Sequence, residues 1–176
     1  MTALPSLPVA AMVEPAAFLA LLAGARRDVL TRTIPNWVSG FVAVAGLLLR
    51  SLAGDLVLAL AAALLSVSGL WVLWRCGMLG GGDVKLISAC ALLVAPGRLP
   101  SLLAAIVISG GALGVAYLLL RSLRLPQVRT VPARHARPLV RLVRIEAWRA
   151  RRGVGVPYGC AITAGALAVV VGAGSG

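Results

Sequence analysis

Residues 56–74 read LVLALAAALLSVSGLWVLW, an apolar run without a charged side chain. A helix needs about 20 such residues to cross the hydrocarbon core of a bilayer. The rest of the chain has the same character: 60% of its 176 residues are hydrophobic, 12% are charged, and the mean hydropathy is +0.99. A soluble domain carries roughly a quarter of charged residues. The sequence therefore predicts an all-α polytopic membrane protein.

Working outward from this run, we find six apolar segments, with boundaries placed to within a few residues. They are Val9–Ala25, Trp37–Leu52, Leu56–Trp74, Val84–Ala95, Leu99–Leu120 and Val156–Val171. Glu14 and Pro15 interrupt the first segment. The fourth is short for a full crossing, so it must be tilted, extended by its flanks or packed inside the bundle. We predict about six transmembrane helices in one domain over residues 1–176, with a basic loop at about 121–155.

The basic residues predict the orientation. If the segments alternate across the bilayer, the loops after the first, third and fifth lie on one side. Of the 17 Lys and Arg residues, all but two fall in these loops: Arg26, Arg27, Arg32, Arg75, Lys85, Arg121, Arg124, Arg129, Arg134, Arg137, Arg141, Arg144, Arg149, Arg151 and Arg152. Only Arg50 and Arg98 lie on the other side. The positive-inside rule then places the three loops in the cytoplasm and both termini outside. No basic residue precedes the first segment, which predicts a retained helix and not a cleaved signal peptide.

The formal net charge of +12 does not predict nucleic-acid binding, because the Arg residues flank apolar segments and only Trp148 adds an aromatic ring to the basic loop. Two interpretations of that loop stay open: a short helix at the lipid headgroups that starts near Pro138, or a solvated linker that enforces topology. The three cysteines are scattered without a CxxC pair, and His135 is the single histidine. We therefore expect no disulfide framework, no metal and no cofactor.

The chain has five acidic residues, and acids near a membrane core are expensive and tend to be functional. Glu14 lies in the first segment, Asp55 is expected to cap the helix that follows it, and Glu146 lies among Arg residues. Asp28 and Asp83 differ because both fall at the cytoplasmic boundary, one after the first segment and one before the fourth. The alternatives are a loop acid that balances nearby Arg residues for Asp28, and a cap in a flexible turn for Asp83.

Two carboxylates that face each other cannot both ionise easily, so one keeps a proton and the pair supplies a base and an acid near neutral pH. The base can activate a water and the acid can protonate the carbonyl oxygen or the leaving amine. The glycines before Asp83 would let a substrate strand come close to it. No GxxxxGK[ST] pattern is present, which excludes a phosphate-binding loop of that type. Pro35 fixes the chain at the start of the second segment, with Trp37 at interfacial depth.

The motifs come in a fixed order along the chain. They are Asp28, Ile34-Pro35-Asn36, then Gly80-Gly81-Gly82-Asp83-Val84-Lys85-Leu86, and Val156-Pro157-Tyr158-Gly159 at the start of the last segment. This ordered set resembles the prepilin peptidases, the GxGD-type aspartic proteases of membranes. It joins all the apolar segments except the fifth.

The resemblance implies cleavage of type IV prepilin-like precursors, beside a Gly that ends a basic leader, at the cytoplasmic face of the bacterial inner membrane. It implies that Asp28 and Asp83 are the catalytic pair and that Lys85 is an electrostatic neighbour of Asp83. The residues that would shape the site are Gly80, Gly82, Lys85, Pro35 and Asn36. The implied partners are the prepilin substrate, membrane lipid and a pilus or secretion machinery, without nucleic acid.

One departure from the family matters. Large members carry a cytoplasmic insertion with two CxxC pairs linked to N-methylation of the mature pilin, and this chain lacks it. The chain looks like the short Tad/Flp-pilus type, so we expect no methyltransferase activity. The alternatives are a preflagellin or pseudopilin peptidase and a non-catalytic membrane component of a pilus or secretion system. A small transporter is disfavoured because neither internal repeats nor a midplane charge in paired segments is present.

Overall fold

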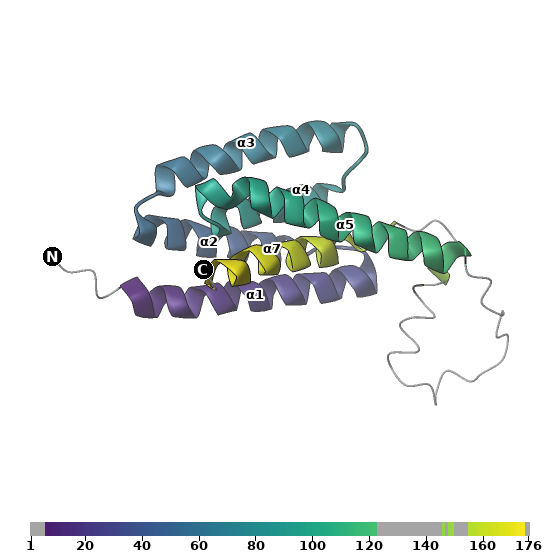
Figure 1. Ribbon diagram of the computed structural model, residues 1–176, viewed down its shortest axis with the longest axis horizontal. Coiled ribbons are helices and arrows are strands. Elements are labelled where there is room, and N and C mark those ends of the chain that lie inside the picture. The colour runs from purple at the N-terminus through teal and green to yellow at the C-terminus, as the bar shows by residue number, and fades with distance from the viewer. Residues whose placement is uncertain (1–5, 123–145, 147, 150–154, 175–176) are drawn as a thin grey trace, which may run out of the picture. The chain divides into compact units, whose positions relative to one another are not determined.

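The structure is a computed structural model that describes residues 6–122, 146, 148–149 and 155–174. Its helices in chain order are α1 (Ser6–Thr31), α2 (Asn36–Ala53), α3 (Leu56–Arg75), α4 (Gly81–Leu93), the 3-10 turn η1 (Pro96–Arg98), α5 (Leu99–Ser122) and α7 (Tyr158–Gly174) (Figure 1). The contacts divide the chain into two compact units. The first comprises Met1–Ser109 with Pro157–Gly176, and the second comprises Gly110–Val156.

Each of the six apolar segments coincides with a helix, and the described residues contain no strand. Four helical stretches are long and apolar enough to cross a membrane: Val9–Thr31, Asn36–Ala53, Leu56–Arg75 and Pro96–Leu119. A shorter apolar helix covers Tyr158–Gly172. The prediction of an all-α polytopic membrane protein is thereby confirmed.

The first helix is longer than its sequence predicts. α1 runs through Pro15 without a break and continues to Thr31, whereas the sequence placed the end of the first segment at Ala25. The predicted end was wrong because it was placed where the charged residues Arg26 and Arg27 begin, and these residues do not interrupt a helix. The next proline after Ala25 is Pro35, which disfavours helical geometry in the residue before it. The left-handed backbone of Arg32, with φ 57°, ends the helix just beyond Thr31.

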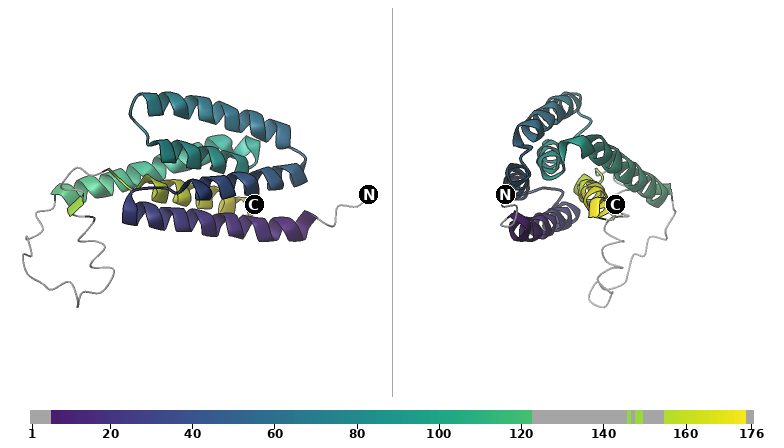
Figure 2. Two further views of the ribbon diagram at one scale, coloured as in Figure 1. Left: turned by 180° about the vertical axis from the view of Figure 1, so that it is seen from behind. Right: turned by 60° about the vertical axis from the view of Figure 1, so that its left-hand side comes forward.

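The short helix α4 forms the core of the first unit. It packs against α2, α3 and α7, while α1 packs against α2 and α7 (Figure 2). Its buried side chains are Leu86, Ile87, Ala89, Cys90, Ala91, Leu92 and Leu93. Of the three explanations for a short fourth segment, packing inside the bundle is the one that the structure supports.

Two glycines let helices approach closely in this unit. A Cβ on Gly46 of α2 would lie 2.6 Å from the backbone carbonyl carbon of Leu92 in α4. A Cβ on Gly165 of α7 would lie 2.7 Å from the backbone nitrogen of Ile106 in α5. Real Cβ atoms do not come this close to backbone, so both contacts require glycine. Small residues at such contacts are typical of helix packing in membranes.

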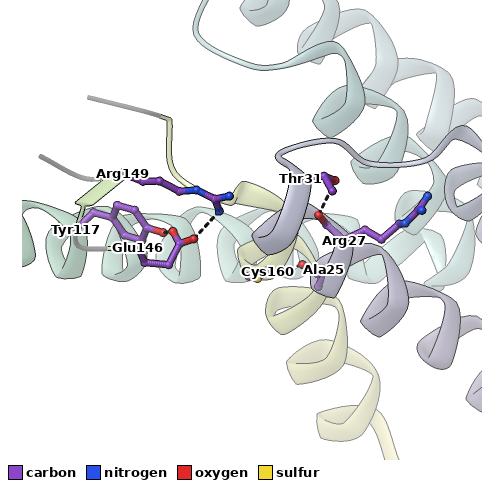
Figure 3. A network of polar contacts seen from close by, with 7 residues as sticks. All are labelled: Ala25, Arg27, Thr31, Tyr117, Glu146, Arg149 and Cys160. Carbon is purple, nitrogen blue, oxygen red and sulfur yellow. Dashed lines mark hydrogen bonds and ion pairs between the residues drawn. The ribbon is translucent and has the colours of Figure 1, made fainter. Parts of the chain in front are cut away.

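The second unit contains the end of α5 and a polar cluster on Glu146. The hydroxyl of Tyr117 donates to Oε2 of Glu146, and Nη1 of Arg149 donates to its Oε1 at 2.7 Å (Figure 3). Glu146 is therefore a local charge partner, as its Arg-rich surroundings predict. Most of the basic loop, with Pro138 and His135, lies outside the described residues, so neither interpretation of that loop is tested.

Candidate active site

Asp28 lies near the end of α1 and is only 6% exposed. Its Oδ2 accepts a hydrogen bond of 2.8 Å from the backbone N–H of Gly159, which joins α1 to the start of α7. A buried carboxylate is costly unless donors satisfy it, and this N–H also orients the carboxyl group. The sequence placed Asp28 in a loop after the first helix. That prediction was wrong, because α1 continues past Asp28 to Thr31.

The position of Gly159 favours a glycine. A Cβ there would lie 3.0 Å from Oδ2 and 3.2 Å from Cβ of Asp28, so the Asp28 side chain would have to shift by a few tenths of an ångström. The same junction is held by Cys160, whose Sγ–H donates to the backbone oxygen of Ala25 at 3.7 Å (Figure 3). The sequence marked Val156–Gly159 as a motif without giving Gly159 a role. The signal that could have found it was the place of this motif at the start of the last apolar segment.

Asp83 lies in the first turn of α4 and is partly buried. Its Oδ2 accepts a hydrogen bond of 3.3 Å from the backbone N–H of Gly80, as acidic residues in the first turn of a helix commonly do. The alternative prediction, that Asp83 caps this helix, agrees with this hydrogen bond to the N–H of Gly80. The predicted flexible turn is wrong for Gly81 and Gly82, which belong to the helix.

The environment of Asp83 changes its acidity. Burial, and to a smaller extent the negative charge of Asp28, raise the pKa of Asp83 from 3.8 to about 6, although the N–H of Gly80 opposes this shift. The charge of Asp83 in turn acts on Tyr158, the first residue of α7. The two carboxyl groups thus interact across α1 and α4, and α7 borders both. A group with a pKa near 6 exchanges its proton close to neutral pH, as general acid–base chemistry requires.

The remaining predicted site residues join the start of α2 to the start of α4. Nζ of Lys85 donates to Oδ1 of Asn36 at 3.2 Å, across the two helices. A Cβ on Gly82 would lie 3.5 Å from the Cβ of Ile34, in ordinary contact with the segment between α1 and α2. Pro35 is the residue before the first turn of α2, where its fixed φ suits the start of a helix. The hydrogen bond of Lys85 goes to Asn36, whereas the sequence suggested Asp83 as its neighbour.

Comparison with known proteins bears on this arrangement. The sequence model of the type IV leader peptidase family matches residues 16–115, more than half of the 176 residues, and the match includes Asp28 and Asp83. The chain belongs to the type IV leader peptidase family. No curated protein and no solved structure matches it. The resemblance to the prepilin peptidases is confirmed, and the chain is a protease of that kind.

Two other acids of this leader peptidase have different surroundings. Asp55 stands directly before α3, but its side chain makes no capping hydrogen bond there. Its Oδ2 accepts instead from Nη1 of Arg50 at 3.1 Å, near the end of α2. The predicted capping contact was wrong because a charged donor lies within reach of the same carboxylate. Glu14 is exposed on α1.

The described part of this leader peptidase shows no group of three or more His, Cys, Asp or Glu side chains placed to hold a metal ion. Cys76, Cys90 and Cys160 are all free thiols. The junction of α1, α4 and α7 presents two carboxyl groups with backbone donors, and the amide of Asn36 and the ammonium group of Lys85 belong to the same site.

Proposed function

We propose that this leader peptidase is a membrane aspartic endopeptidase that cleaves the leader from type IV prepilin-like precursors of the Flp type, with Asp28 and Asp83 as its catalytic pair. The observation that carries the proposal is that Asp28 and Asp83, on helices far apart in the sequence, lie near enough for the charge of Asp28 to help raise the pKa of Asp83. Each carboxyl group also accepts a backbone N–H, so each is oriented before substrate binds. The family match supplies the class of reaction.

The two carboxyl groups have different roles in the proposed reaction. Asp83 keeps the proton that the pair shares, since burial and, to a smaller extent, the charge of Asp28 raise its pKa. The Asp28 carboxylate takes a proton from water as the water oxygen attacks the scissile carbonyl carbon. Asp83 donates its proton to the carbonyl oxygen. When the tetrahedral intermediate collapses, the C–N bond breaks and the proton on Asp28 passes to the leaving amine. One hydroxyl proton of the intermediate returns to the Asp83 carboxylate as the C=O bond re-forms, which restores the starting protonation of the pair.

The pH dependence of cleavage tests both the mechanism and the roles. Asp83 must be protonated, and its pKa is about 6. We therefore expect kcat/KM for a prepilin-like precursor to fall as the pH rises through about 6, approaching a tenfold loss per pH unit. The measurement is initial cleavage rates of the purified protein in lipid nanodiscs from pH 4.5 to 8.5. A rate that instead falls as the pH drops through 6 would exchange the roles of acid and base.

The pH dependence of the protein's stability gives an independent test of the raised pKa of Asp83. Because the pKa of Asp83 is higher in the folded chain than its ordinary value of 3.8, the folded state binds this proton more tightly than the unfolded state. Its contribution to stability is then complete below about pH 4 and is lost as the pH rises through 6. We expect the melting temperature of Asp83→Asn, which cannot titrate, to lack this component of the pH dependence.

We place the site on the cytoplasmic face of the bacterial inner membrane, because the basic loops and both carboxyl groups share one side of the alternating topology. In a variant with Cys76 replaced by Ser, a cysteine in place of Thr130 should resist a membrane-impermeant maleimide in intact cells. A cysteine in place of Ala53 should react within minutes. The extent of maleimide labelling at each position is measured by the mass shift of the protein. The reversed pattern would place the basic loops and the site on the outer side of the membrane.

A further inference from the structure

A groove of about 580 Å³ lies between α2, α3 and α4 in the first unit. Its lining residues are Asn36, Ser39, Gly40, Ala43, Leu60, Ala63, Leu64, Val67, Val84, Lys85, Ser88, Ala89 and Leu92. On each helix these residues recur at spacings of three or four, so the groove follows one face of each helix over about two turns. It is therefore an elongated channel along the helices, and not an isolated void.

The groove continues from the candidate active site. Its polar end is formed by Asn36 and Lys85, which are joined by a hydrogen bond of 3.2 Å. Val84 and Lys85 directly follow Asp83 in the first turn of α4. From there the groove runs along α4 to Leu92, a length of about 12 Å at 1.5 Å per residue. The polar end of the groove therefore lies within two residues of Asp83 along α4.

We propose that this groove binds a helical apolar segment of the substrate, the part that adjoins the scissile bond and lies in the bilayer. The inference rests on the proposed function, and it adds the place where the substrate is held. A precursor cut at carboxyl groups on a membrane boundary must itself lie in the membrane next to them. Its apolar helix then needs a channel that runs along the bundle from near the carboxyl groups. This groove begins at Val84 and Lys85, directly after Asp83 in α4.

The walls of the groove favour a peptide helix over a lipid acyl chain. Small side chains make up much of the lining on α2 and α4, namely Ser39, Gly40, Ala43, Ser88 and Ala89. Such residues let the backbones of two helices approach closely, which is how helices associate in a bilayer where the hydrophobic effect gives no drive. At the polar end, the amide oxygen of Asn36 can accept a backbone N–H that is exposed at the start of a helix. The ammonium group of Lys85 can donate to a backbone carbonyl of the segment that precedes that helix.

A matched pair of glycines gives a direct test. Gly40 lines the groove on α2, and Gly69 lies on α3 outside it. A Cβ at either position would meet no atom within 4 Å, so neither position is crowded where a side chain begins. In lipid nanodiscs, Gly40→Leu should raise KM for a full prepilin-like precursor at least tenfold, while Gly69→Leu should match the wild type. A Gly40→Leu variant with an unchanged KM would overturn the proposal.

A second substrate separates the groove from the chemistry. With a short soluble peptide that spans the scissile bond but lacks the apolar segment, Gly40→Leu and Gly69→Leu should show the same KM. A groove filled by lipid would instead make Gly40→Leu affect both substrates alike, in nanodiscs but not in lipid-free detergent, and that result would also overturn the proposal.

Cross-linking tests the groove without requiring cleavage. In the Asp83→Asn protein, a photoreactive benzophenone at position 64 should cross-link the precursor, and the same group at position 65 should not. Both leucines are exposed on α3, but only Leu64 lines the groove. Equal cross-linking from both positions, or from neither, would exclude the groove. If the wild type fails to cleave either substrate but position 64 still cross-links, the peptidase function fails while the binding site stands.

Discussion

Asp28→Asn and Asp83→Asn are each expected to reduce precursor cleavage by about a thousandfold or more, because each removes one half of a pair that acts as a unit. Asparagine keeps an oxygen that can accept the N–H of Gly159 at position 28, and the N–H of Gly80 at position 83. The fold should therefore persist while the proton transfer is lost. Cleavage of a prepilin-like precursor by purified variants in nanodiscs, with melting temperatures measured in parallel, checks both halves of this statement.

Asp55→Asn is the matched control, since it changes an acid that pairs with Arg50 and not with the candidate site. Loss of a partly exposed ion pair costs about 1 kcal/mol or less, so cleavage should stay within about twofold of the wild type. An inactive Asp55→Asn beside an active Asp83→Asn would remove Asp83 from the mechanism. A wild-type protein without activity would favour the non-catalytic component of a pilus or secretion system.

Gly46→Ala is expected to be the most damaging small substitution in the described core. The added Cβ would lie 2.6 Å from the carbonyl carbon and 2.8 Å from the carbonyl oxygen of Leu92, and backbone cannot turn aside as a side chain can. α2 and α4 must separate, at a cost of about 1–3 kcal/mol for overpacking. Because α4 carries Asp83 and α2 carries Asn36, we also expect cleavage to fall at least tenfold. Thermal unfolding in detergent and the precursor assay measure the two effects.

The same change elsewhere on α2 should have the opposite sign. Gly40→Ala introduces a Cβ that meets no atom within 4 Å, so the better helix propensity of alanine should raise stability by up to about 1 kcal/mol. If Gly46→Ala and Gly40→Ala melted at the same temperature, the close contact between α2 and α4 would be absent from the protein in a membrane.

Apolar run length and motif order carried much of the information that the sequence alone could provide. Hydropathy alone located six helices of the described residues, because a bilayer requires long apolar runs and each run here is bounded by charge or by Gly and Pro. The order of the motifs around Asp28, Asn36 and Asp83 led to the family. The same signals misplaced the end of α1, since Arg26 and Arg27 change hydropathy without interrupting a helix.

Contacts between distant segments could not be predicted in this way. The hydrogen bond between Asp28 and Gly159 joins residues 131 positions apart. The sequence around one of these residues does not indicate that the other is its partner. The partner of Lys85 depends on how α2 and α4 are packed, which hydropathy does not specify. Asp55 pairs with Arg50 because the short connection between α2 and α3 brings the two side chains together. Single-sequence patterns show which residues carry chemistry, whereas packing decides which of them meet.

The hydrogen bond between Gly159 and Asp28 also has a consequence for the order of events during biosynthesis. Asp28 is synthesised with α1, whereas its backbone donor belongs to α7, which follows α4 and α5 in the sequence. A ribosome that has completed α4 has already delivered both carboxyl groups to the membrane, but the donor that orients Asp28 has not yet been synthesised. A nascent chain thus holds an incomplete site until α7 is in place.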